Sequence, residues 1–292
     1  YCKFRAMKIL ILGATGMVGY NLYKCLKNYN DIFLSIRRKS IINENIFSEA
    51  EKVFFFDAYE ILELANQLDD IRPNVIINAI GVTKQISKID IANSIYINSL
   101  FPHNLYKICQ EKGIRLIAFS TDCIFSGKKG FYSETDFADA QDLYGKTKFL
   151  GELYSEGSIT IRKSTIGLEL QNKHGLIEWW LGQKGQIKGY NNAIYSGIIT
   201  AELGNVVNKI IHDFPELSGV WNISSDPISK YDLLSMLHKK LNRKDVTMIR
   251  DNSFTCDRSL DSTAFKNLTK YKAPTWNEML DTLAHEIERK QN

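Results

Sequence analysis

The chain has 292 residues and a formal net charge of +4, with 44% hydrophobic and 24% charged residues. These values are typical of a folded protein and exclude a largely disordered chain. The basic residues form no long run, which argues against nucleic acid as a partner, and no apolar run approaches the roughly 18 residues of a membrane span. The 5 cysteines include no CxxC pair, and the 5 histidines are dispersed. We therefore expect a protein of the reducing cytoplasm, with no disulfide framework and no metal site.

From Met7 onward, short runs rich in β-branched and aromatic residues alternate with amphipathic segments, and residues 1–6 are left out of the fold prediction as an upstream extension. The predicted strands are 8–12, 32–36, 52–56, 74–79, 115–119 and 159–162, and the predicted helices are 17–29, 58–68, 92–111 and 143–156. Strands separated by helices pair in parallel through right-handed crossovers. The pattern predicts an α/β fold, a Rossmann-type doubly wound parallel sheet over residues 7–163.

The remainder of the chain, residues 164–292, is more irregular. Its predicted helices are 201–213, 230–242 and 276–289, with short strands near 219–223 and 246–250. We interpret this part as mainly a smaller C-terminal substrate-binding lobe, with the helix 201–213 packing back on the first domain.

Three glycines, Gly13, Gly16 and Gly19, follow the first predicted strand at the spacing GxxGxxG. The first permits a tight turn, the second lets the backbone approach a pyrophosphate, and the third lets helix and strand pack closely. A purely structural turn can carry such glycines, but their place after a buried N-terminal strand favours a dinucleotide site at a helix N-terminus. The loop residues predicted to bind the cofactor are Gly13, Thr15, Gly16, Met17, Val18 and Gly19.

The end of the second predicted strand indicates which dinucleotide binds. An NAD site usually has a carboxylate there for the adenosine 2′-hydroxyl, and this chain has Arg37 and Arg38 instead. Two guanidinium groups can pair with a 2′-phosphate, so we predict NADPH, with NADH as a poorer substitute; a solvated basic loop is the alternative. Asp57, after the third strand, is predicted to bind the adenine amine, to cap the next helix, or to do both.

Tyr144 and Lys148 stand four residues apart, so a helix places both side chains on one face. Reduction of a carbonyl needs a proton donor beside the accepting oxygen, and a free tyrosine with a pKa of about 10 is a sluggish donor near neutral pH. A neighbouring ammonium lowers that pKa, and the same lysine can hold the nicotinamide ribose. The pattern YxxxK is common by chance on solvated helix faces, so its support comes from the residues upstream.

Those residues stand at the ends of the fourth and fifth predicted strands, where ligands bind in an open parallel sheet. Thr121 is predicted to orient the substrate carbonyl with Asp122 beside it, and a turn built by the two is the alternative. Asn98, on the long predicted helix, either relays a proton through water to Lys148 or bridges backbone groups. The fourth-strand residues predicted to lie against the cofactor are Asn78, Ala79 and Gly81.

The motifs GATGMVG, NAIG, STDCIFSG and YGKTK, followed by Gly151 and Glu152, resemble the extended short-chain dehydrogenases/reductases in order and spacing. The stretch 120–152 and the later CDRSLDSTAF, residues 256–265, resemble the dTDP-4-dehydrorhamnose reductase family in particular. The resemblance covers nearly the whole chain from Met7.

That resemblance implies NADPH-dependent reduction of the C4 ketone of a nucleotide-linked 4-keto-6-deoxyhexose, in the synthesis of polysaccharide precursors. Thr121, Tyr144 and Lys148 match the catalytic Thr, Tyr and Lys of the family. Hydride would pass from the nicotinamide to the carbonyl carbon, and Tyr144 would protonate the oxygen.

The chain departs from the family pattern in places. Cys123 stands where the family often has Tyr, and it either lines the sugar pocket or fills a small apolar space. Trp179 and Tyr190 either stack on the substrate or pack in the core. Arg258 is predicted to bind the pyrophosphate, with a surface ion pair as the alternative. These departures leave the nucleotide open between dTDP and UDP, and they admit an N-acetylated sugar.

Two other functions stay open. A nucleotide-sugar epimerase, or a bifunctional epimerase and reductase, would keep the same residues and add a second acid–base group. A non-catalytic NADP-binding regulatory subunit would keep the fold without turnover, which the Thr, Tyr and Lys set argues against. The resemblance to the superfamily disfavours dehydration, because its dehydratases tend to carry an Asp–Glu pair after the strand-end Thr, and here Cys123 follows Asp122. A homodimer is compatible with the fold.

Overall fold

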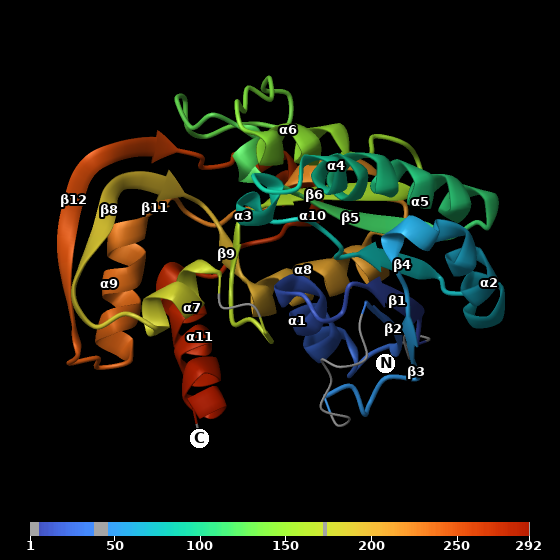
Figure 1. The fold of residues 1–292 in the computed structure, drawn as a ribbon, viewed down its shortest axis with the longest axis horizontal. Helices are drawn as coiled ribbons and strands as arrows, with labels where there is room; N and C mark the ends of the chain where they lie inside the picture. The colour runs from blue at the N-terminus through green and yellow to red at the C-terminus, as the bar shows by residue number, and fades with distance from the viewer. Residues whose placement is uncertain (1–5, 38–45, 172–173, 292) are drawn as a thin grey trace. The chain divides into compact units, whose positions relative to one another are not determined.

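The computed structural model describes residues 6–37, 46–171 and 174–291 (Figure 1). The chain divides into two compact units. Unit 1 comprises Tyr1–Ser120, Asp142–Ile161 and Gly204–Val220, and unit 2 comprises Thr121–Gln141, Arg162–Leu203 and Trp221–Asn292. The sequence prediction divided the chain once, after residue 163, whereas each unit of the structure comprises three separate segments of the chain. No helix in the described part of the chain is both long enough and apolar enough to span a membrane.

Unit 1 is built on a seven-stranded sheet with the order β10-β6-β5-β4-β1-β2-β3. The pairings of β1 with β2 and β4, of β2 with β3 and of β4 with β5 are parallel. The carboxyl ends of β5, β6 and β10 pass into unit 2. The strands are β1 (Lys8–Leu12), β2 (Asp31–Ile36), β3 (Lys52–Phe55), β4 (Val75–Asn78), β5 (Arg115–Thr121), β6 (Ser158–Lys163) and β10 (Gly219–Asn222).

Helices cover both faces of this sheet, with α1 and α8 on one side and α4, α5 and α6 on the other (Figure 1). The inner strand β1 explains the arrangement, because its residues Ile9–Leu12 are fully buried and need apolar cover on both faces. The fold is the predicted Rossmann-type doubly wound sheet. The helices are α1 (Met17–Leu26), α2 (Ile61–Ile71), α3 (Lys84–Ser87), α4 (Ile91–Ile95), α5 (Phe101–Glu111), α6 (Leu143–Leu150) and α8 (Thr200–Asp213), with a 3₁₀ turn η2 (Ala58–Glu60) before α2.

The predicted helix 92–111 differs from the structure in its interior. A π-helical turn, η3 (Tyr96–Leu100), separates α4 from α5. Sequence periodicity does not reveal such a turn, because one extra residue shifts the register without changing the helical character. The turn lies where Ile97, Asn98 and Ser99 are buried.

Two predicted helices are shorter than expected. The helix 17–29 ends at Leu26, and Tyr29 beyond that end is 65% exposed, whereas Tyr23 within the helix is buried. The helix 143–156 ends at Leu150 with Gly151 as its cap.

Unit 2 contains the three-stranded sheet β11-β8-β12 and a two-stranded pairing of β7 with β9. The helix α9 packs on β8 and against α11. The 11-residue strand β8 was not predicted, since its alternating polar residues and glycines hide the strand pattern. The elements are β7 (Thr165–Ile166), α7 (Leu176–Leu181), β8 (Gly185–Tyr195), β9 (Ile198–Ile199), β11 (Ile228–Ser229), α9 (Lys230–Lys240), β12 (Val246–Asp257), α10 (Thr263–Thr269) and α11 (Trp276–Gln291).

Candidate active site

The glycine loop joins β1 to α1 and has the geometry that its spacing predicts. Gly13 has a φ of +79°, which favours glycine, and a Cβ there would lie 3.0 Å from the Ile80 side chain. A Cβ on Gly19 would lie 2.3 Å from the carbonyl oxygen of Gly13, so helix and loop pack too closely for any side chain. The first and third glycines are therefore required by the fold itself.

The second glycine, Gly16, is the N-cap of α1, and it has extended backbone geometry. Within the described residues no side chain caps the helix at this point. The amides of the first turn, which Met17 and Val18 begin, are the kind of donor set that accepts a phosphate. Thr15 is half-buried in the same loop.

The residues predicted to select the cofactor lie after β2 and β3. Arg37 is exposed directly after β2, and Arg38 lies outside the described residues. Asp57 caps the 3₁₀ turn η2, because its Oδ1 accepts a hydrogen bond from the Tyr59 amide at 3.0 Å. The capping role predicted for Asp57 is therefore present in the structure.

The pair Tyr144 and Lys148 lies on α6, which Asp142 caps by accepting a hydrogen bond from the Gly145 amide at 2.9 Å. Lys84 forms an ion pair with the other carboxylate oxygen of Asp142 at 2.6 Å. The Lys148 ammonium donates to the carbonyl oxygen of Phe119 at 2.6 Å. The helix is thus anchored at its start, and its lysine is fixed at the carboxyl end of β5.

The electrostatic setting of Lys148 combines burial with a buried carboxylate. Burial lowers the pKa of Lys148 to about 8, and the negative charge of Glu152 acts in the opposite direction. Glu152 is only 3% exposed and accepts hydrogen bonds from the hydroxyls of Ser120 at 2.6 Å and Tyr154 at 2.9 Å. Sequence reasoning assigned no role to Glu152, although it stands four residues after Lys148, a spacing at which side chains on a helix can interact.

The fourth-strand residues Asn78, Ala79 and Gly81 lie at and after the end of β4. The buried Asn78 accepts a hydrogen bond from the Ile80 amide at 3.1 Å, which shapes the turn, and the Ala79 amide continues the pairing to Leu12. Half-buried Ala79 and exposed Gly81 leave little side-chain volume at this strand end.

Asn98 lies in the π-helical turn η3 and is 1% exposed. Its amide accepts from the backbone amide of Val82 at 2.9 Å and donates to the Val82 carbonyl at 3.1 Å. A further hydrogen bond, 3.3 Å long, reaches the Thr147 hydroxyl on α6. The structure therefore places Asn98 as a bridge between backbone groups, the second of the two roles considered from the sequence.

In unit 2, Thr121 is the last residue of β5, and its hydroxyl caps the short 3₁₀ turn η4 (Asp122–Ile124). Its oxygen accepts from the Cys123 amide at 3.1 Å and donates to the Asp122 carboxylate at 3.0 Å. The turn that was considered as an alternative is thus formed, and it fixes the side chain of Thr121 at the strand end.

Asp122 is a buried carboxylate in unit 2. Burial raises its pKa, and the guanidinium of Arg258 opposes that shift. Burial and the charge of Asp122 together raise the pKa of Tyr195 well above its usual range. The Tyr195 hydroxyl is buried and has no hydrogen-bond partner among the described residues. Sequence reasoning missed Tyr195, because nothing in its local pattern separates it from a packed tyrosine.

Arg258 belongs to the motif CDRSLDSTAF and contacts the motif STDCIFSG. Its Nε donates to the carbonyl of Phe125 at 2.8 Å, and its Nη1 lies 3.8 Å from the Cys123 sulfur, which is half-buried. The described contacts of Arg258 thus include backbone and sulfur partners, in addition to its charge interaction with Asp122.

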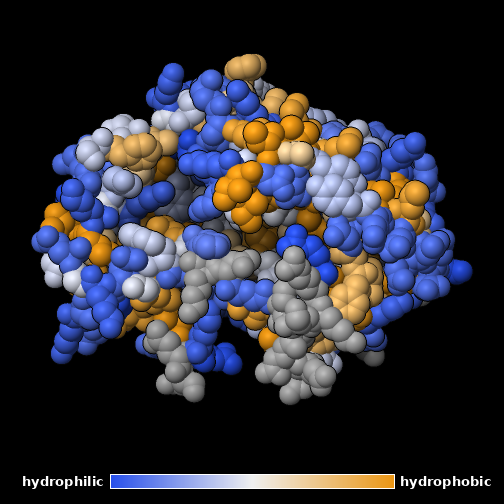
Figure 2. Space-filling view, viewed as in Figure 1, coloured by the Kyte–Doolittle hydropathy of each residue, from blue (hydrophilic) through white to orange (hydrophobic). Residues whose placement is uncertain are grey.

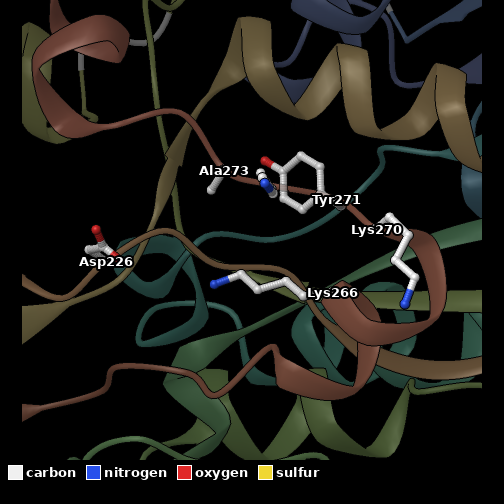
Figure 3. A pocket seen from close by; sticks show the side chains of 6 residues that line it. Asp226, Lys266, Lys270, Tyr271 and Ala273 are labelled. Carbon is white, nitrogen blue, oxygen red and sulfur yellow. The ribbon is translucent and has the colours of Figure 1, made fainter.

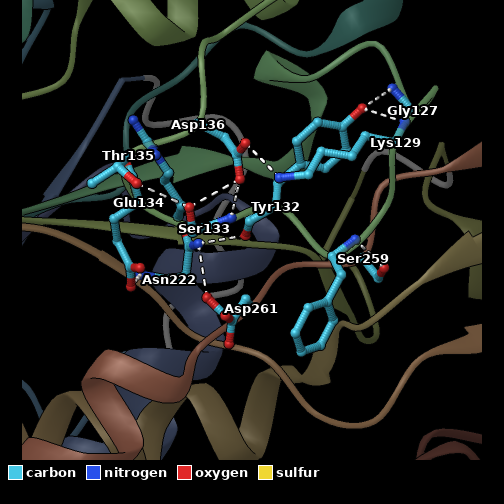
Figure 4. Close-up of polar contacts among 12 residues, drawn as sticks. Gly127, Lys129, Tyr132, Ser133, Glu134, Thr135, Asp136, Asn222, Ser259 and Asp261 are labelled. Carbon is cyan, nitrogen blue, oxygen red and sulfur yellow. Dashed lines mark hydrogen bonds and ion pairs between the residues drawn. The ribbon is translucent and has the colours of Figure 1, made fainter.

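The loop that follows η4 is fastened to the segment around Ser259 (Figure 4). The Phe131 amide donates to the Ser259 hydroxyl at 2.8 Å, and Asn222 donates to the carbonyls of Tyr132 at 2.9 Å and Asp261 at 3.0 Å. The motifs STDCIFSG and CDRSLDSTAF, 130 residues apart at Ser126 and Cys256, therefore meet within unit 2.

The two predicted aromatic residues lie on the surface of unit 2. Trp179 on α7 and Tyr190 on β8 are each 41% exposed. The Tyr190 ring lies 5.2 Å from that of Phe254 on β12, centroid to centroid. Neither side chain is in the core, which leaves both available to a ligand.

A cavity of about 380 Å³ is present in unit 2, away from these predicted residues (Figure 3). Tyr271 presents its ring there, and its hydroxyl donates to Glu202 at 2.8 Å. The lining residues are Asp226, Lys266, Lys270, Tyr271, Lys272 and Ala273. None of these six was singled out from the sequence. Separately, among the described residues no group of three or more His, Cys, Asp or Glu side chains is arranged to hold a metal ion.

The chain is similar in sequence and in fold to known proteins. The chain is 28% identical over 240 residues to the dTDP-4-dehydrorhamnose reductase of Aggregatibacter actinomycetemcomitans, covering 77% of this chain and 76% of that protein. It is 29% identical over 150 residues to methionine adenosyltransferase 2 subunit beta of Mus musculus, covering 50% of this chain and 41% of that protein.

A solved structure of the dTDP-4-dehydrorhamnose reductase of Bacillus anthracis in complex with NADP matches 97% of this chain and 100% of its own, with a TM-score of 0.79 and 20% identity. At that identity the likeness shows the fold. The model of the family described as RmlD substrate binding domain matches residues 7–164, which is more than half of the chain. The chain therefore belongs to the RmlD substrate binding domain family.

Proposed function

We propose that this protein is an NADPH-dependent reductase of the C4 ketone of a nucleotide-linked 4-keto-6-deoxyhexose. The observation that carries the proposal is the anchoring of Lys148 to the carbonyl of Phe119 at the end of β5, with Tyr144 one turn earlier on the same helix. That arrangement offers a proton donor beside a cation at the strand end where ligands bind in such sheets. The reductase of Aggregatibacter actinomycetemcomitans supports the substrate class.

The glycine loop fits a dinucleotide, because no side chain occupies the space at Gly16 and the first amides of α1 have no side-chain cap among the described residues. NADPH, when bound, supplies the hydride. Tyr144 donates its phenolic proton to the carbonyl oxygen, so that hydride and proton together convert the ketone to an alcohol. The Lys148 ammonium stabilises the phenolate that proton donation leaves on Tyr144, and the Thr121 hydroxyl orients the carbonyl.

The proposed preference for NADPH over NADH rests on Arg37, an exposed guanidinium directly after β2 where a carboxylate would favour NADH. The sugar nucleotide is proposed to be dTDP-linked, with UDP-linked and N-acetylated 4-keto sugars as the other substrates to test. Trp179, Tyr190 and Arg258 are the residues proposed to contact it, with Asp122 and Cys123 near the sugar.

The experiment that tests the proposal measures NADPH oxidation with a 4-keto-6-deoxyhexose offered on dTDP and, separately, on UDP. We expect oxidation with one of them, slower oxidation when NADH replaces NADPH, and a product sugar with a C4 hydroxyl. An enzyme that binds NADPH but oxidises it with neither substrate would contradict the proposal.

One observation favours epimerase activity as a second candidate. Epimerisation needs an acid–base group besides Tyr144, and the buried Asp122 carboxyl beside the Tyr195 hydroxyl is such a group. Exchange of solvent deuterium into the sugar, without oxidation of NADPH, would identify this activity. A regulatory subunit, the third reading, is supported by the partial likeness to methionine adenosyltransferase 2 subunit beta.

We further propose that the protein forms a homodimer through an apolar helical surface of unit 1, made of Ile86, Ile89, Ile91, Ile95 and Leu100. These side chains are 45% to 86% exposed and come from α3, α4, η3 and the turn between the first two (Figure 2). Contiguous apolar surface of this kind commonly marks an interaction site. A second copy of the chain would cover it.

A further inference from the structure

We propose that Glu152 is a positioning residue of the active site, which keeps Lys148 protonated and its ammonium group at the carboxyl end of β5. The proposal rests on the proposed reductase function, because it assigns Glu152 a task in proton donation by Tyr144. Glu152 itself would contact neither substrate nor cofactor.

The Glu152 carboxylate is held on both of its oxygens inside unit 1. It follows α6 by two residues, is 3% exposed, and accepts one hydrogen bond on each oxygen. Ser120 on β5 donates to Oε1 at 2.6 Å, and Tyr154 donates to Oε2 at 2.9 Å. These two hydrogen bonds fix the position of the carboxylate inside unit 1.

The carboxyl end of β5 contacts both Lys148 and Glu152. Adjacent residues of β5 hold the two opposite charges, because the carbonyl of Phe119 accepts from Lys148 at 2.6 Å and the hydroxyl of Ser120 donates to Glu152 at 2.6 Å. One strand therefore sets the positions of both side chains. A buried lysine without a nearby carboxylate tends to lose its proton, and the fixed charge of Glu152 opposes that tendency.

Four other ionisable groups on the segments around α6 have hydrogen-bond or ion-pair partners other than Lys148. Lys84 on α3 pairs with Asp142 at the opposite end of α6, and Asp90 caps α4 through the Asn93 amide. His103 on α5 contacts the Leu150 carbonyl, and Tyr96 in η3 donates to the Ala58 carbonyl. The carboxylate of Glu152 is thus the charge best placed to act on Lys148 from within unit 1.

A purely structural role for Glu152 would anchor the turn after α6 and nothing more. Glu152→Gln separates the two roles, because glutamine keeps the size and one hydrogen-bond acceptor while it removes the charge. Glu152→Asp keeps the charge on a side chain shorter by one methylene. Glu156→Gln is the matched control, since it makes the same change at an exposed site four residues later.

The first measurement is the reactivity of Lys148 in the cofactor-free protein, by competitive labelling with acetic anhydride from pH 6 to 11 and mass spectrometry of the Lys148 peptide. Burial lowers the pKa of Lys148 to about 8 in the unchanged chain, and Glu152 raises it against that effect. Loss of the carboxylate should therefore move the labelling midpoint to lower pH by about one unit. Glu156→Gln should leave the midpoint in place.

The second measurement is the pH profile of kcat/KM for reduction. Tyr144 loses its neighbouring cation as the pH rises through the pKa of Lys148, so turnover should fall on the alkaline side. In Glu152→Gln this fall should begin about one pH unit lower, and Glu152→Asp should restore most of the difference.

The outcomes separate the two proposals. A chain that binds NADPH but reduces no keto sugar would refute the reductase function, and the labelling midpoint would still test Glu152. Equal midpoints for Glu152→Gln and the unchanged chain would overturn the role of Glu152 even if reduction is confirmed. If Glu152→Gln does not fold, Tyr154→Phe removes one anchor of the carboxylate and should shift the midpoint in the same direction, and an unshifted midpoint there would equally overturn the role.

Discussion

Tyr144, the proposed acid, and Lys148, the cation proposed to activate it, lie one turn apart on α6. A tyrosine is a sluggish donor near neutral pH, and a cation beside it makes the phenolate accessible. Asp142 fixes the start of α6 and Phe119 holds the lysine, so the Lys148 ammonium has a defined position at the end of β5. Such preorganisation costs nothing at the moment of proton transfer.

Replacement of Tyr144 by Phe should abolish most reduction. The phenol is the proposed proton donor, so we expect kcat to fall about 100- to 10,000-fold, while NADPH binds with nearly unchanged Kd. Steady-state NADPH oxidation gives the first quantity, and fluorescence titration of NADPH gives the second.

The control for this change is Tyr154→Phe, which removes a phenol from an exposed residue near the same helix. Any effect there should be a shift of the pH profile and not a comparable loss of kcat at neutral pH. Undiminished turnover in Tyr144→Phe would instead show that another group donates the proton.

At the scale of elements, close backbone contact joins α6 to the π-helical turn η3. Gly151 caps α6, and a Cβ at that position would lie 1.9 Å from the carbonyl oxygen of Asn98. Asn98 in turn bridges Val82 and Thr147. The π-helical turn η3, which interrupts the predicted helix 92–111, therefore lies where α6 is in close backbone contact with it.

Substitution of Gly151 by Ala should destabilise the fold, because the methyl group meets main-chain atoms that cannot move aside. We expect a loss of about 1–3 kcal/mol in the free energy of unfolding, to be measured by urea denaturation. Thermal unfolding should show the same loss as a lower Tm.

Gly182→Ala serves as the comparison, since a Cβ at this helix end has only ordinary contacts of 3.5 Å and 3.6 Å with main-chain oxygens. Its free energy of unfolding should stay within about 0.5 kcal/mol of the unchanged chain. Equal stability of the two variants would show that η3 and α6 can separate without cost.

At the scale of the whole molecule, the proposed homodimer depends on the apolar helical surface of unit 1. The combined change Ile89→Asp and Ile95→Asp places two charges on that surface, where the residues are 86% and 48% exposed. A homodimer should then dissociate, and light scattering should give the mass of one chain, 33.4 kDa, in place of twice that value.

Leu62→Asp is the matched control, because Leu62 on α2 is 80% exposed and does not belong to the apolar helical surface. It should leave the mass of the dimer unchanged. An unchanged chain that is already monomeric at micromolar concentration would contradict the proposed dimer.

The sequence by itself determined the framework of unit 1. The buried strands, the glycine loop and the pair Tyr144 and Lys148 are local patterns, in which a short run of residues is enough to identify strand, turn or helix face. β1 has its predicted bounds, and α8 begins one residue before its predicted start. The family could be recognised for the same reason, since its motifs are local.

Only the tertiary structure decided the contacts that join residues distant along the chain. It brought Ser120 to Glu152, tied Asn98 to Val82 and Thr147, and set Tyr195 beside Asp122. It also showed the π-helical turn and the long strands β8 and β12 of unit 2. These features depend on burial and on partners far apart in sequence, and the local periodicity of side chains identifies neither.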